Sequence, residues 1–185
     1  MQGPLARAAP LIRQASDMKT GIMEVAAHGE NVRTGLDVAA RQKLAALLTE
    51  CLADTMLLTL KSQVFHWNVV GPIFLDLHRL TEEHYKDMFE AADEIAERVR
   101  ALGNLVPLDA HRMARASILG EELSLRTTEE MLEQLINDHE TVVRNMRNTA
   151  HECEDLGDMV THDLLVKRMA FHEKAIWMLR AIAAS

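Results

Sequence analysis

The chain has 185 residues, of which 48% are hydrophobic and 26% charged, and its formal net charge is −8 at pH 7. This length fits one domain with its own core, and no stretch approaches the roughly 18 uninterrupted apolar residues that a membrane-spanning helix needs. Few aromatic and many Ala, Leu, Met and Glu residues favour an all-α protein, and the two well-separated cysteines, Cys51 and Cys153, predict a reducing cytoplasm.

The predicted domain organisation is a flexible tail over residues 1–35, with scattered Gly and Pro, followed by a helical domain over residues 36–185. Apolar residues then recur at steps of three and four from about residue 37 to 66, which predicts a first long helix that ends before Gly71-Pro72. A second long helix is predicted from about residue 74 to 102, ending at a glycine.

Residues 104–126 predict a long connection with one short helix around residues 110–116. The sequence Thr127-x-x-Glu130 is a capping box, which predicts a third helix to about residue 154. A glycine interrupts the pattern, and we expect Thr161 to cap a fourth helix that ends near residue 183. Short links within each pair of helices and a long link between the pairs predict a four-helix bundle with one crossover.

Acidic residues are concentrated between residues 121 and 163. This segment has twelve Asp and Glu residues and three arginines, which gives a net charge of −9. The first twenty residues have a net charge of +2. Dense negative charge repels nucleic acid and attracts cations, so the body of the protein is expected to handle cations. A solvated helix face is the simpler interpretation for most of these acids.

The second predicted helix carries a row of possible metal ligands along one border of its apolar face. With His78 at zero and ~100° per residue, Glu82, Asp93 and Glu97 lie at about 40°, 60° and 100°. Glu82 and Asp93 are nevertheless about 16 Å apart along the helix. One ion could reach both ends only if two copies of the helix packed antiparallel about a two-fold axis, which would create two identical sites per dimer.

The segment 61–103 has the pattern K-x4-HWNVVGP-x-F-x2-LH-x3-E followed by D-x-IAER-x3-LG, and the run RMAFHEKAIWMLR follows near the C-terminus. These motifs resemble the Dps family of mini-ferritins over nearly the whole chain. The resemblance implies a ferritin-like bundle, assembled as a hollow dodecameric cage, that oxidises Fe(II), preferably with hydrogen peroxide, and stores Fe(III) to protect DNA from oxidative damage.

By the same resemblance, an iron centre shared between subunits takes ligands from both. One subunit supplies His66, His78 and Glu82, the other supplies Asp93 and Glu97, and Trp67 beside the centre can absorb oxidising equivalents. Mixed imidazole and carboxylate ligands also suit redox iron on chemical grounds. Ordinary ferritins use Glu-x-x-His pairs inside each bundle, and the chain has no such pair, so any iron site is expected between subunits.

Simpler alternatives exist for each residue taken alone. His78 could be a surface residue at a helix start, Asp93 and Glu97 could be solvated charges, and Trp67 could belong to the core. Only their joint spacing favours a metal centre. Six of the other seven histidines have no such constellation and are expected at the surface or in local hydrogen bonds: His84, His111, His139, His151, His162 and His172.

Two further expectations concern iron entry and DNA. The family lines its three-fold pores with acids from the region between the last two helices, where Glu154, Asp158 and Asp163 match best, although Asp158 and Asp163 could instead help cap the fourth helix. Some family members bind DNA through lysine-rich tails. Three basic residues in the first twenty predict weak DNA binding. The main rival to iron oxidation and storage is a role as a nucleoid-binding architectural protein. The third candidate is an inert helical scaffold.

Overall fold

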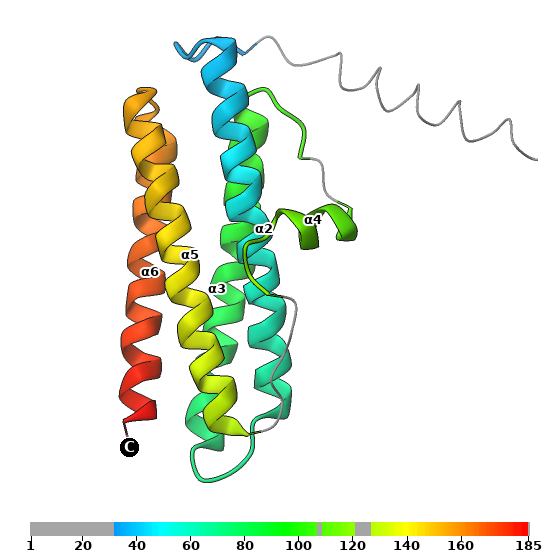
Figure 1. Cartoon of the computed structure of the whole chain (residues 1–185), viewed down its shortest axis with the longest axis vertical. Helices are drawn as coiled ribbons and strands as arrows, with labels where there is room; N and C mark the ends of the chain where they lie inside the picture. The colour runs from blue at the N-terminus through cyan, green and yellow to red at the C-terminus, as the bar shows by residue number, and fades with distance from the viewer. Residues whose placement is uncertain (1–31, 107–108, 121–126, 185) are drawn as a thin grey trace, which may run out of the picture. The chain divides into compact units, whose positions relative to one another are not determined.

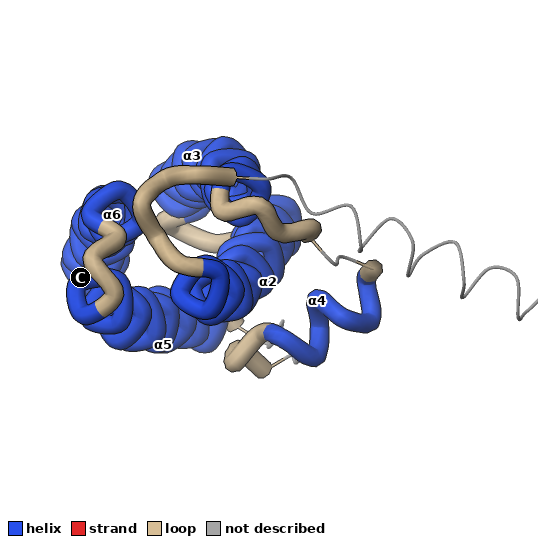
Figure 2. The backbone as a smooth tube through the Cα atoms, turned by 90° about the horizontal axis from the view of Figure 1, so that it is seen from above, coloured by secondary structure: helices blue, strands red, loops and turns tan. Residues whose placement is uncertain are grey.

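The computed structural model describes residues 32–106, 109–120 and 127–184, and all regular structure in these ranges is helical. Four long helices form a bundle, and a short helix lies outside it (Figures 1 and 2). Their bounds are α2 (Val38–Asn68), α3 (Phe74–Ala101), α4 (Ala110–Ala116), α5 (Thr128–Asp155) and α6 (Met159–Ala183). The predicted bundle with one crossover is confirmed. The predicted tail falls mainly on residues 1–31, which lie outside the described residues.

The bundle is built from two helical hairpins, α2 with α3 and α5 with α6, and α2 also packs along α5. Of the helix pairs that touch, α3 and α6 touch least. Apolar side chains from all four long helices form a single core, made mainly of Leu, Ile, Val, Met and Ala. On α2 the buried residues are not confined to one stripe, because the five consecutive residues 51–55 are all buried. None of the helices in the described ranges is long and apolar enough to cross a membrane.

Local capping signals explain most helix ends. Asp37 accepts a hydrogen bond from the Ala40 amide at the start of α2, and Thr127 and Glu130 form the predicted capping box at the start of α5. The prediction that Thr161 caps the last helix is wrong. The N-cap is Asp158, whose carboxylate accepts from the Thr161 amide at 3.0 Å, so Thr161 lies inside the first turn of α6.

The crossover is fastened to the bundle through one buried carboxylate. Asp54 on α2 is fully buried and accepts hydrogen bonds from the Ser117 hydroxyl at 2.7 Å, the Ile118 amide at 2.9 Å and the Asn145 side chain at 2.8 Å. Because the donors come from the end of α4 and from α5, this single side chain ties three segments together. The contact also places α4 against α2, as Figure 1 shows.

Candidate metal centre

The candidate ligands His66 and His78 lie on either side of the tight link between α2 and α3. Gly71 in this link has φ of +99°, a conformation that residues with a Cβ atom rarely adopt. The Thr128 hydroxyl at the start of α5 donates to the Val70 carbonyl at 2.8 Å and so holds the link against the bundle. The turn therefore brings the last turn of α2 next to the first turns of α3.

The two imidazole rings are oriented by reciprocal hydrogen bonds. His66 Nδ1 donates to the carbonyl of His78, and His78 Nδ1 donates to the carbonyl of His66, both at 2.8 Å. The rings stack with centroids 3.7 Å apart. Since a carbonyl can only accept, each Nδ1 must carry the proton, which leaves the Nε2 lone pair of each neutral ring available for a metal ion.

Glu82 lies one helical turn beyond His78 and is near both imidazoles. Its carboxylate accepts from Lys86 at 2.6 Å, and this hydrogen bond, followed by the charge of Lys86, lowers the pKa of Glu82. The carboxylate is therefore ionised at neutral pH. Because both side chains of the pair are well exposed, the Lys86 contact is weak and replaceable by a cation.

Asp93 and Glu97 lie further along α3, and both are exposed on the single subunit. One subunit thus brings together His66, His78 and Glu82 and leaves the other two carboxylates apart. Among the described residues of one subunit, no group of three His, Cys, Asp or Glu side chains could hold a metal ion. Within the described residues of one subunit, His66, His78 and Glu82 therefore form an incomplete set of metal ligands.

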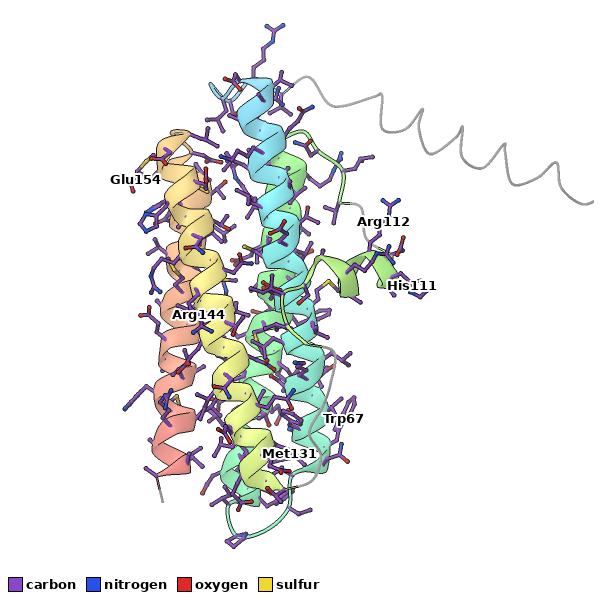
Figure 3. All side chains as sticks on the ribbon, viewed as in Figure 1. Trp67, His111, Arg112, Met131, Arg144 and Glu154 are labelled. Atoms are coloured by element: carbon purple, nitrogen blue, oxygen red, sulfur yellow. The ribbon has the colours of Figure 1, made fainter. Side chains whose placement is uncertain are left out.

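Aromatic side chains surround this half-site, which is defined here as His66, His78 and Glu82. Trp67 is 66% exposed near the end of α2, so the alternative that it belongs to the core of the subunit is wrong (Figure 3). Tyr85 meets the His66 ring edge-on at 5.4 Å, and Phe74 stacks on His78 at 5.0 Å. The sequence interpretation missed Tyr85, although its position one turn after Glu82 was a usable signal.

Charged and polar side chains also lie inside the bundle, which the sequence interpretation did not foresee. Lys61 on α2 is buried and pairs with Asp138 on α5 at 2.8 Å. Burial raises the pKa of Asp138, against the effect of the Lys61 hydrogen bond. His84, His139 and His172 are expected at the surface or in local hydrogen bonds. The surface alternative is wrong, because all three are buried between α3, α5 and α6. His139 and His172 do form a hydrogen bond, but with each other across 33 residues of the chain.

The three candidate pore residues differ in their surroundings. Glu154 is exposed near the end of the bundle opposite to Trp67, and Asp163 is exposed in the first turns of α6 (Figure 3). Asp158 is 3% exposed and forms a bidentate contact with Arg98 at 2.8 and 2.9 Å. Burial opposes its ionisation, but hydrogen bonds from Thr161 and Arg98 prevail and lower the pKa of Asp158. The alternative that Asp158 caps the fourth helix is confirmed. That Glu154 and Asp163 line a pore between subunits stays a prediction.

Comparison with known proteins identifies the family of the chain. Residues 45–185 match the model of the ferritin-like domain family. The chain is 38% identical to an uncharacterized low temperature-induced protein of Nostoc over 81% of this chain and 85% of that protein. It is 33% identical to DNA protection during starvation protein 1 of Deinococcus radiodurans, over 76% of this chain and 69% of the relative.

Among solved structures, the bundle is similar to the Dps protein of Vibrio cholerae O1, described as a member of a broad superfamily of ferritin-like diiron-carboxylate proteins. The TM-score is 0.76 at 27% identity, covering 81% of this chain and 95% of that chain. The chain belongs to the ferritin-like family and, within it, to the Dps mini-ferritins.

Proposed function

We propose that the protein oxidises Fe(II) at sites shared between subunits and stores the Fe(III) product inside a dodecameric cage, thereby protecting DNA. The observation that carries the proposal is the pair of carbonyl-bound imidazoles, which hold two Nε2 lone pairs beside the ionised Glu82. The names of the relatives support the general role in DNA protection, and the diiron-carboxylate superfamily of a structural neighbour supports iron as the metal.

The division of ligands explains why the substrate would be bound and then oxidised. Neutral imidazoles suit Fe(II), whereas carboxylates stabilise the more highly charged Fe(III). Asp93 and Glu97 from a two-fold partner would complete the half-site, because an isologous contact brings opposite ends of α3 together. Hydrogen peroxide is the proposed oxidant: it takes one electron from each of two ferrous ions and, with two protons, becomes two molecules of water.

The polar core beneath the half-site supports its geometry. Lys61 lies on α2 before His66, and its contact with Asp138 attaches this part of α2 to α5. The Thr128 contact with the link does the same from the start of α5. A rigid support matters because a metal centre requires ligands that already point in the right direction before the ion arrives.

The test compares the wild-type protein with the double variant His66→Ala/His78→Ala. We expect the variant to assemble but to lose fast peroxide-driven oxidation of Fe(II), measured as the absorbance of the ferric product. His151→Ala is the matched control, because His151 is exposed on α5. Wild-type rates in an assembled double variant would contradict the proposed site.

DNA compaction as the main role is not favoured by the described residues. The chain has a net charge of −8, and the acidic connection between α5 and α6 repels phosphates. We propose instead a cytoplasmic protein that binds DNA weakly. A gel-shift assay with duplex DNA at two salt concentrations tests this point, and tight binding at physiological salt would contradict it.

A further inference from the structure

A second pair of histidines lies inside the bundle, away from the half-site. His139 on α5 and His172 on α6 are fully buried, and their Nδ1 atoms are 2.8 Å apart. One Nδ1 must donate and the other must accept, so at least one ring has to be neutral for this hydrogen bond to exist. The Nε2 atom of each ring is buried and has no hydrogen-bond partner in the described residues.

The charged groups around the pair offer no free anion to stabilise an added proton. On α6, Arg168 pairs with Asp87 of α3 at 2.6 Å. On α5, Asp138 already pairs with Lys61 of α2. Both carboxylates therefore have a cation as partner, and a protonated ring would be a further positive charge near Arg168.

The remaining titratable neighbours lie along the loosely packed side between α3 and α6. His84 of α3 has its ring centroid 5.6 Å from that of His139. A cavity of about 220 Å³ between the two helices is lined by Glu83, His84, Asp87 and Lys174 among others. Glu83 is exposed, so water already screens its charge. His84 lines this cavity, whereas His139 and His172 do not.

The energetic consequence has a definite sign. Burial lowers the pKa of His172 to about 3, helped by repulsion from Arg168 and His84. Burial also lowers the pKa of His139 well below its usual value, with a smaller contribution from His172. Since the folded-state pKa lies below that of the unfolded chain, the stabilisation is complete above about pH 6.5 and falls as the pH drops towards the folded-state pKa.

We propose that the His139–His172 pair is an acid-sensitive joint between α5 and α6, closed while the rings are neutral and forced open when protons are taken up. The half-site histidines have no part in it, and the pair is not a prepared metal site, because the described residues offer no three-ligand group within a subunit. The physical basis is the fully buried contact between the two Nδ1 atoms. The nearby carboxylates of Asp138 and Asp87 already have cationic partners.

The expected size follows from proton linkage. Each buried histidine raises the unfolding equilibrium constant about tenfold for each pH unit below about 6.5, as long as the folded form stays unprotonated. Two such histidines raise it about a hundredfold per pH unit. Ordinary Asp and Glu side chains titrate mainly below about pH 4.5, so the interval between pH 6.5 and 5 isolates the histidines.

The test uses the assembled full-length protein and the variant His139→Gln/His172→Gln, with thermal and denaturant unfolding followed at pH 7.5 and pH 5. Glutamine keeps a polar group but cannot take up a proton. We expect the loss of stability between the two pH values to be clearly smaller in the variant. His151→Gln/His162→Gln is the control, because neither residue is buried, and it should behave as the wild type.

A purely structural role would lower stability equally at both pH values, and an unchanged pH dependence in the variant would overturn the proposal. Hydrogen–deuterium exchange of the wild-type protein gives a second measurement if the variant does not fold. After correction for intrinsic exchange rates, protection of α5 and α6 should fall at pH 5 more than protection of α2. Equal changes in the three helices would also overturn the proposal.

Discussion

Two pairs of histidines in this subunit show how the same side chain serves opposite purposes. In the half-site, the Nδ1 atoms of His66 and His78 donate to backbone carbonyls, so each Nε2 keeps a usable lone pair. In the bundle interior, the Nδ1 atoms of His139 and His172 form a hydrogen bond with each other, and burial keeps solvent away from this contact. The partner of one ring nitrogen therefore decides what the other can do.

The largest expected effect comes from testing whether a second subunit completes the half-site. Cages of His78→Ala chains or of Glu97→Ala chains should each be inactive in iron oxidation. In an equal mixture, half of the two-fold dimers would be mixed, and each mixed dimer would hold both lesions in one site and leave the other whole. About a quarter of the wild-type activity should return. No recovery in verified mixed cages would show that the site lies within one chain.

The interior pair should behave in the opposite way. His139→Ala removes a buried ring and leaves His172 without its partner, so we expect the free energy of unfolding to fall by about 2–4 kcal/mol. The rate of iron oxidation per folded subunit should stay near the wild-type value. Chemical denaturation and the peroxide-driven oxidation assay, performed on the same preparation, separate the two effects. A strong loss of oxidation in folded protein would connect the two histidine pairs.

The acids at the other end of the bundle extend the comparison to carboxylates. Asp158→Asn should lower the free energy of unfolding by about 1–3 kcal/mol, because it leaves Arg98 without its buried anion, although Asn can still accept the capping hydrogen bond from the Thr161 amide. Glu154→Gln/Asp163→Gln should leave stability within ~0.5 kcal/mol and slow iron uptake, mainly at low ionic strength. Uptake kinetics at two salt concentrations distinguish the roles, and normal uptake in the second variant would remove these acids from the pore.

The smallest expected effect concerns the turn that positions the half-site. Gly71→Ala introduces a Cβ atom with no heavy atom within 4 Å, so the cost is backbone strain at positive φ, about 1 kcal/mol. Iron oxidation should decrease only slightly if the turn keeps its shape. Thermal melting with parallel activity measurements checks this expectation, and a large loss of activity would mean that the turn geometry itself aligns the two imidazoles.

Much of the bundle could be predicted because its signals are local. The first long helix was expected over residues 37–66 and spans Val38–Asn68, the second agrees to one residue, and the Thr127 capping box is present. The candidate half-site was also readable, since a Gly-Pro turn with histidines on both sides constrains where the rings can lie. Turn chemistry, capping and apolar periodicity all act over a few residues, so a single sequence contains them.

Only the tertiary structure shows how side chains pair when their partners are distant in the chain. Nothing near Asp158 in the sequence identifies Arg98, 60 residues earlier, and nothing near Asp54 identifies the crossover and Asn145. The same holds for His139 and His172, which are 33 residues apart and come within hydrogen-bond distance only because α5 packs against α6. The helices, the turn and the candidate ligands follow from the sequence, because their signals are local. The burial and pairing of the polar side chains follow from long-range packing, because it sets which helices become neighbours.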